Sequence, residues 1–152
     1  MVEIERCTLL PGSVERAFDL SLDINAHLKS LSASDERAVD GVREGLIGLS
    51  ETVTWRARHF GVTWTMTSQI TEWDRPGWFA DEQVRGPFKA FRHEHEFRPV
   101  GDQTEMRDRV VFTAPAGVIG RLVERLVLRR YLARLIDVRN AYLTESLGTE
   151  IR

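Results

Sequence analysis

The sequence predicts an α+β fold in which a curved antiparallel sheet grips one long C-terminal helix. Consecutive segments between residues 51 and 113 alternate apolar and polar side chains and are separated by turn residues, which is typical of antiparallel strands with one buried face. Residues 117–146 then carry apolar side chains at helical spacing over roughly 45 Å, at 1.5 Å per residue. A sheet with one apolar face and a helix long enough to cross it can bury each other.

The segment before the alternating region predicts one strand, two short helices and a second strand, over residues 2–10, 14–22, 24–31 and 36–42. Ser13 and Asp23 are suitable N-caps for the two helices. The glycines after the second strand predict a bulged or looped stretch up to residue 50.

Residues 51–72 predict a hairpin whose two strands are joined by Phe60-Gly61. A two-residue loop at this point matches inward side chains with inward side chains, which supports the register. The resulting pairs are His59 with Val62, Ala57 with Trp64, and Trp55 with Met66.

Three further strands are predicted over residues 78–84, 89–98 and 104–113. The first has two candidate orientations, because either Phe79, Asp81 and Gln83 or Trp78, Glu82 and Val84 face inward; we favour the former set. A two-residue loop at Gly101-Asp102 gives four inward pairs on the last two strands, which are Phe97 with Met106, His95 with Asp108, His93 with Val110, and Phe91 with Phe112.

The predicted C-terminal helix has an apolar stripe of Leu128, Leu132, Leu135, Ile136 and Leu143, widened by Ile119, Val123, Val127, Tyr131 and Tyr142. Its arginines lie mostly outside this stripe, and they are Arg121, Arg125, Arg129, Arg134 and Arg139. We interpret them as a solvated face, with an acidic lipid or an acidic partner as the alternative.

Length and composition fit a single domain over residues 1–152. Because 21 basic and 23 acidic residues give a net charge of −2, binding of nucleic acid through bulk charge is excluded. Cys7 is the only cysteine, so there is no intramolecular disulfide and no cysteine-based metal site. The chain has neither a signal-peptide pattern nor the roughly 20 apolar residues of a membrane span, and we expect a cytoplasmic protein.

The predicted pair of His95 and Asp108 is unusual on an apolar face, because a buried carboxylate is costly unless it is paired. One interpretation is a polar patch in a cavity, with His95 and Asp108 as orienting or acid–base groups and His93 beside them. A second is a structural hydrogen bond that fixes strand register. A third is a zinc site, which we disfavour because any strand with alternating histidines shows this pattern and a zinc hydrolase also needs a third ligand, for which His59 is a guess, and an open coordination position.

An apolar pocket with a few polar groups is the usual form of a small-molecule site. Trp55, Trp64 and Met66 are interpreted as an inward cluster that forms its wall, although core packing explains each residue singly. The predicted ligand-binding residues are Trp55, His59, Trp64, Met66, Asp81, Gln83, Phe91, His93, His95, Phe97, Asp108, Val110 and Phe112.

A family resemblance rests on the stretches TWRARHFG, FADEQVRGPFKAFRHEHEF and MRDRVVF and on the helix GVIGRLVERLVLRRYLARLIDVRNAYL. Through them the chain resembles the START-like or SRPBCC superfamily, the polyketide cyclase and lipid-transport group. The resemblance covers nearly the whole chain, and the branch it points to is bacterial and ligand-binding. It implies a helix-grip fold with a seven-stranded sheet and a deep cavity between sheet and helix.

The resemblance leaves the function open, because this group includes carriers, receptors and enzymes. We expect binding of a small hydrophobic or amphipathic ligand, namely a lipid, a polyketide or an aromatic compound, without a cofactor or metal. One alternative is a cyclase, dehydratase or isomerase-like enzyme in which His95 transfers a proton and Asp108 holds its tautomer. The other is a protein-interaction module with a filled cavity. A homodimer is a further expectation.

Overall fold

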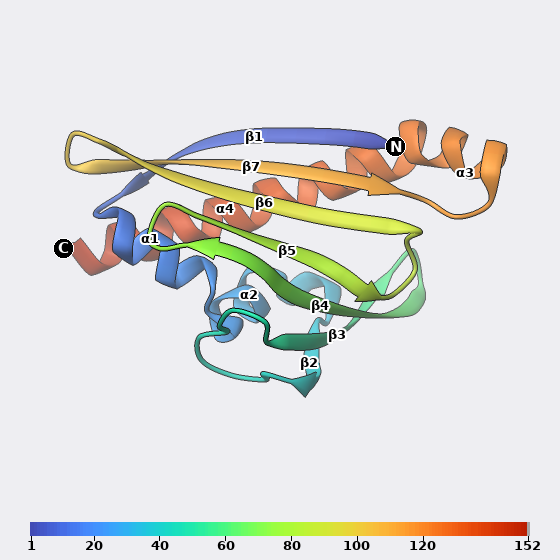
Figure 1. The fold of residues 1–152 in the computed structure, drawn as a ribbon, viewed down its shortest axis with the longest axis horizontal. Helices are drawn as coiled ribbons and strands as arrows, with labels where there is room; N and C mark the ends of the chain where they lie inside the picture. Colours follow the sequence, from blue (N-terminus) through green and yellow to red (C-terminus); the bar gives the residue numbers. More distant parts are fainter. Residues whose placement is uncertain (152) are drawn as a thin grey trace.

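The computed structural model describes the backbone of residues 1–151 and the side chains of residues 1–149, and residue 152 lies outside this part. An antiparallel sheet curves around a long C-terminal helix (Figure 1). The strands are β1 (Val2–Pro11), β2 (Arg37–Gly41), β3 (Thr52–His59), β4 (Val62–Asp74), β5 (Trp78–Arg85), β6 (Ala90–Val100) and β7 (Gln103–Thr113). The helical elements are α1 (Val14–Ser21), α2 (Ile24–Ser30), η1 (Ser32–Ser34), α3 (Gly117–Val123), the π-helical segment η2 (Glu124–Leu128) and α4 (Arg129–Ile151).

The seven strands pair in the order β1-β7-β6-β5-β4-β3-β2, and each pair is antiparallel. The predicted α+β helix-grip fold is therefore confirmed. Strands β2 to β6 each pair with the next strand along the chain. β1 pairs with β7, so that the first and last strands lie side by side. This arrangement brings the start of the chain next to the helix that follows β7 (Figure 1).

The predicted registers of both hairpins are confirmed, with Trp55 opposite Met66 and His95 opposite Asp108. Phe60 has a φ of 55° and Gly61 a φ of 71°. These left-handed values are those that a type I′ turn requires at both loop positions. In β5, Phe79 lies opposite His95, so the favoured orientation of this strand is also confirmed.

Helices α1 and α2 close one end of the sheet. Their predicted caps are confirmed, since the Ser13 hydroxyl accepts from the Arg16 amide and the Asp23 carboxylate accepts from the Asn25 and Ala26 amides. A buried core fills the space between these helices, the sheet and the end of α4. Its members include Phe18, Phe79, Phe97, Met106, Leu143 and Leu147.

The C-terminal helix differs from the regular α-helix that the sequence predicts, because η2 is a π-helical segment between α3 and α4. The stripe from Leu128 to Leu143 is buried or half-buried, as expected. The predicted widening of this stripe by Ile119, Val123 and Val127 is wrong, because these side chains are exposed. A π-turn contains more residues than an α-turn, so it shifts the phase of the residues before it relative to those after it.

Glu124 is buried at the start of η2, with 1% of its surface exposed. Its carboxylate accepts hydrogen bonds from the Ala114 amide and from the Met1 amino group, the latter at 3.4 Å. The side chain therefore ties the beginning of the helical segment to the end of β7 and to the chain start.

Substituting Glu124 with alanine is expected to lower the free energy of unfolding by about 1–3 kcal/mol, because the Ala114 amide is left buried without an acceptor. Glu124→Gln should lose less, since its side-chain oxygen still accepts from that amide. Urea denaturation of the two variants and of the exposed control Glu44→Ala measures the difference. Equal stability of all three variants would contradict the anchoring role of Glu124.

Candidate functional site

A cluster of ionisable side chains lies on the inner face of β5, β6 and β7. Because side chains alternate along a strand, His93 and His95 share this face of β6. The register places Asp81 of β5 opposite His93 and Asp108 of β7 opposite His95. The four side chains therefore come from three neighbouring strands, and we call them the His–Asp cluster.

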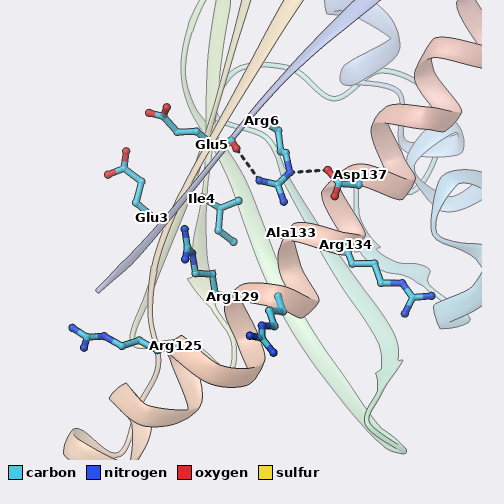
Figure 2. Close-up of a pocket in the computed structure, with 10 residues that line it drawn as sticks. Glu3, Ile4, Glu5, Arg6, Arg125, Arg129, Ala133, Arg134 and Asp137 are labelled. Atoms are coloured by element: carbon cyan, nitrogen blue, oxygen red, sulfur yellow. Dashed lines mark hydrogen bonds and ion pairs between the residues drawn. The ribbon is translucent and has the colours of Figure 1, made fainter.

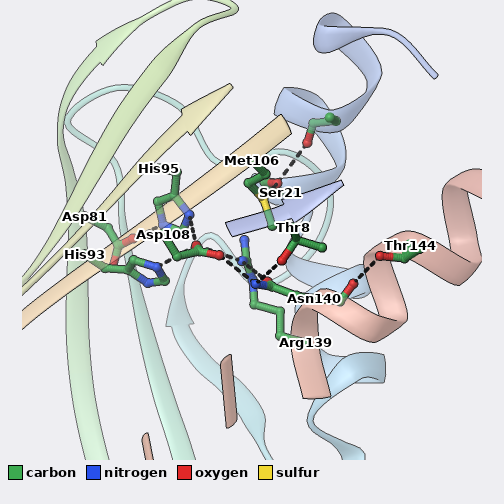
Figure 3. Close-up of polar contacts among 11 residues, drawn as sticks. Thr8, Ser21, Asp81, His93, His95, Met106, Asp108, Arg139, Asn140 and Thr144 are labelled. Atoms are coloured by element: carbon green, nitrogen blue, oxygen red, sulfur yellow. Dashed lines mark hydrogen bonds and ion pairs between the residues drawn. The ribbon is translucent and has the colours of Figure 1, made fainter. Parts of the chain in front are cut away.

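Asp108 is the centre of the cluster and is fully buried. Its Oδ1 accepts a hydrogen bond from Nε2 of His93 at 2.8 Å, and its Oδ2 accepts one from Nδ2 of Asn140 at 2.7 Å (Figure 3). The guanidinium of Arg139 lies 3.5 Å from Oδ1. Asn140 also donates to the Thr8 hydroxyl at 3.2 Å. The carboxylate is thus held by β6 on one side and by α4 on the other.

His95 lies between two rings, with its centroid 4.1 Å from that of Phe79 and 3.7 Å from that of His93. Its Nε2 donates to Oδ2 of Asp81 at 3.0 Å. Its Nδ1 lies 3.1 Å from Oδ1 of Asp108 but makes no hydrogen bond of acceptable geometry in the described part of the chain. If the Nε2 proton is the only one on the ring, Nδ1 presents a lone pair to a carboxylate, and the two repel each other.

The predicted juxtaposition of His95 and Asp108 is therefore present, but the hydrogen bonds are distributed differently. His93, not His95, donates to Asp108, while His95 donates to Asp81. The hydrogen-bond partner of a ring depends on its rotamer, which the strand register does not determine.

Burial would raise the pKa of Asp108, but the two histidines beside it and the charge of Arg139 outweigh burial, so the pKa lies well below the usual range of an aspartate. The pKa of Asp81 is also lowered, because the hydrogen bond from His95 and the neighbouring histidines outweigh burial. Burial lowers the pKa of His93, and the charge of His95 lowers it further, against the opposing effect of Asp108. At neutral pH the cluster thus holds two carboxylates and a neutral His93.

The cluster lies at the boundary between two parts of the interior. On one side, Phe79, Phe97 and Met106 belong to the filled core beneath α1 and α2. On the other side is a smaller core, which includes Val110 and Phe112. Several inner-face side chains remain half-buried. Two of them, Asp81 and His93, belong to the cluster, and the others are Trp55, His59, Met66, Gln83 and Phe91.

The predicted wall of Trp55, Trp64 and Met66 does not form one buried cluster. Trp55 packs on His27, with ring centroids 4.3 Å apart, and joins the filled core. Trp64 is 41% exposed, and its indole donates to the His59 carbonyl at 3.1 Å. Trp64 is exposed because it lies near the tip of the β3–β4 hairpin, whose next inward residue is the exposed Val62.

The helix contributes three side chains that the sequence patterns did not single out as site residues. Asn140 and Arg139 contact Asp108, and the Tyr131 hydroxyl pairs with Nδ1 of His59. Asn140 lies four residues after Ile136, so the sequence places a polar side chain within the apolar stripe. This feature could have identified Asn140 as a candidate site residue. Arg139, expected among solvated arginines, is 8% exposed.

Asp81, His93 and His95 are the described residues best placed to hold a metal ion, because their ligand atoms lie within 4.8 Å of one another. Two imidazoles and a carboxylate suit zinc or iron. The Nε2 atoms of both histidines are, however, already within hydrogen-bond distance of carboxylates. The arrangement is that of a hydrogen-bond network around Asp108.

A separate open groove, with a volume of about 820 Å³, lies between β1 and the C-terminal helix (Figure 2). Ile4 and Ala133 are the buried residues of its lining. Nε of Arg6 on β1 forms an ion pair with Oδ1 of Asp137 on α4 at 2.8 Å. The remaining lining is mostly basic, and its helical arginines are Arg125, Arg129, Arg130 and Arg134. This groove shares no residue with the His–Asp cluster.

The lowered pKa of His93 gives folding a pH dependence. The unfolded chain takes up a proton on this residue near its ordinary pKa of 6.5, whereas the folded protein does so only at lower pH. The free energy of unfolding is therefore expected to decrease as the pH falls below about 6.5. His93→Gln, which can still donate to Asp108, should show a smaller decrease.

Urea denaturation at neutral and mildly acidic pH measures this effect. His59→Gln is the comparison variant: because burial also lowers the pKa of His59 outside the cluster, this variant should likewise show a smaller decrease than the wild-type protein. An unchanged pH dependence in His93→Gln would show that His93 is not held neutral by its surroundings.

The chain was compared with known proteins at the level of family, sequence and structure. The family model for polyketide cyclase / dehydrase and lipid transport matches residues 1–147. No curated protein matches the sequence.

Solved structures with the same fold include protein TTHA0849 from Thermus thermophilus, at 19% identity and a TM-score of 0.74, covering 95% of this chain and 99% of that one. A START superfamily protein from Mycobacterium smegmatis is 14% identical with a TM-score of 0.72, covering 95% and 98% of the two chains. A major latex-like protein from Panax ginseng is 11% identical with a TM-score of 0.62, covering 93% and 96%. At these identities the likeness shows the fold, and the family model over nearly the whole length shows that this chain belongs to the polyketide cyclase / dehydrase and lipid transport family.

Proposed function

We propose that this protein binds a small hydrophobic or amphipathic ligand, a lipid, a polyketide or an aromatic compound, between the inner face of the sheet and the C-terminal helix. Membership of the family supports ligand binding in general. The observation that carries the proposal is the contrast along the inner face. Phe79 and Phe97 are buried, whereas Trp55, Met66 and Phe91 remain half-buried on the same inner face of the sheet.

In this proposal the apolar part of the ligand replaces water on the half-buried side chains. This burial contributes about 25 cal/mol of favourable binding free energy per Å² of apolar area, before the entropy cost of ordering the ligand and side chains. The polar end lies at His93, whose side chain is 12% exposed. Since Nε2 of His93 is engaged by Asp108, its Nδ1 remains as an acceptor for a hydroxyl or amide of the ligand. His59, Gln83, Val110, Phe112 and the exposed Trp64 complete the proposed set, and Trp64 would lie at the entrance.

A second candidate function is proton-transfer catalysis of the cyclase or dehydratase type. The feature that favours it is a buried His95 whose Nδ1 makes no hydrogen bond in the described part of the chain, beside a His93 that is neutral at pH 7. A neutral imidazole held by a carboxylate is suited to accept a proton from a bound substrate. For either function, the cytoplasmic setting, the single domain and the homodimer stay predictions from the sequence.

Binding can be measured with the amphipathic dye anilinonaphthalene sulfonate, followed by its fluorescence. Trp55→Ala and Met66→Gln are each expected to weaken dye binding by at least about threefold, because they remove apolar surface from the proposed wall. Trp78→Ala is the matched control, since Trp78 is half-buried on the opposite face of the sheet, against Arg92. Near-ultraviolet circular dichroism verifies that each variant has native packing.

Equal dye affinity of the wild-type protein and all three variants would refute a ligand site on the inner face. Native mass spectrometry of the purified protein then separates the two candidate functions by identifying a co-purified molecule. With that molecule as substrate or ligand, His95→Gln in a carrier should change affinity modestly, whereas an enzyme should lose turnover by about a hundredfold while still binding.

A further inference from the structure

An uncovered apolar stripe runs along α3 and η2. Its side chains are between 40% and 73% exposed, although they are as large and apolar as those that cross the sheet. Spacings of four residues keep them on one face of the helical segment. The stripe consists of Val118, Ile119, Leu122, Val123, Leu126 and Val127. Exposed apolar surface of this extent on one element marks an interaction site.

The stripe faces outward because the opposite side of the same segment is anchored. Glu124 is buried against the Ala114 amide and the Met1 amino group. Gly120, one turn earlier, lies so close to the chain that a Cβ there would be 1.9 Å from the Pro115 carbonyl oxygen. Since positions four residues apart share a helix face, these two residues fix the rotation of the segment.

The stripe is bordered by arginines. Residues 117–134 contain five arginines and one glutamate, a net charge of +4 in a chain whose total is −2. The glutamate is the buried Glu124, so the exposed charges of this segment are its arginines, although Glu3, Glu5 and Asp137 line the neighbouring groove. No ion pair involves any of these arginines in the part of the chain with described side chains. They are Arg121, Arg125, Arg129, Arg130 and Arg134, and the last four also line the groove beside β1 (Figure 2).

The segment is also placed for contact with a large flat surface. In Figure 1, α3 lies beyond the end of β7, at the opposite extremity of the molecule from the C-terminus. The tip of the β3–β4 hairpin adjoins the same region, because Phe60 packs on Tyr131 in the first turn of α4, with ring centroids 4.5 Å apart. Phe60 is itself 58% exposed.

We propose that α3 and η2 dock this protein on the surface of a membrane that contains anionic lipids. The apolar stripe enters the boundary between head groups and acyl chains, and the arginines bind lipid phosphates, as in other basic amphipathic helices. None of the described helices is long and apolar enough to cross a membrane, so the contact is peripheral. A second copy of this chain is a poorer occupant, because a two-fold contact through the stripe would bring unpaired arginines together.

Co-sedimentation with vesicles tests this proposal, which does not depend on the ligand of the inner face. The vesicles consist of phosphatidylcholine alone or of phosphatidylcholine mixed with phosphatidylglycerol. We expect binding to the mixed vesicles, little binding to phosphatidylcholine alone, and weakening by salt. The double variants Leu122→Ser/Leu126→Ser and Arg125→Glu/Arg129→Glu should each lower the affinity by at least about tenfold.

Two double variants at other exposed positions serve as matched controls. Leu9→Ser/Val100→Ser removes two apolar side chains that are 49% and 44% exposed on other elements, and Arg43→Glu/Arg107→Glu reverses two exposed arginines. Both controls should bind the mixed vesicles like the wild-type protein. Circular dichroism confirms the fold of every variant, and the substituted side chains are exposed, so unfolding is not expected.

Absence of binding to the mixed vesicles would overturn the proposal. So would equal binding to both vesicle types, or equal loss in the stripe variants and the controls. Sedimentation velocity adds one further outcome: a dimer that Leu122→Ser/Leu126→Ser dissociates, without vesicle binding, would assign the stripe to self-association instead.

Discussion

The burial of one ionised carboxylate, Asp108, is the constraint around which the interior of this protein is arranged. A buried charge is costly unless several groups stabilise it, and here the donors come from both layers of the fold. His93 approaches from the sheet, while Asn140 and Arg139 approach from the helix. The network therefore fixes how α4 sits across the sheet, in addition to the apolar packing on either side of it.

This network also divides the interior. Beneath α1 and α2 the space is filled mainly by aromatic and aliphatic side chains such as Phe18 and Phe97. Toward α3 the inner face keeps half-buried side chains, among them Met66 and His93. In the proposed function, a ligand beside these side chains would meet apolar walls and one polar end. The same site could orient a bound molecule or exchange a proton with it, which is consistent with a family named for both carriers and cyclases.

The fold could be predicted because period-two alternation fixes which strand residues share a face, and short loops fix the register of each hairpin. That logic placed His95 opposite Asp108. It could not assign the hydrogen bonds, because ring rotamers are set by neighbours such as Phe79 and Asp81. It also could not foresee the π-turn, which begins at the buried Glu124, next to apolar residues of α3 that are exposed.

The most direct test of the central role of Asp108 is its own titration. The carboxyl carbon shift of this residue, followed by NMR as the pH is lowered, reports the state of the buried group. The donors around it should keep it ionised through the range near pH 3.9 where ordinary aspartates take up a proton, for as long as the protein stays folded. A midpoint at or above that range would mean that burial prevails and that the network does not stabilise a charge.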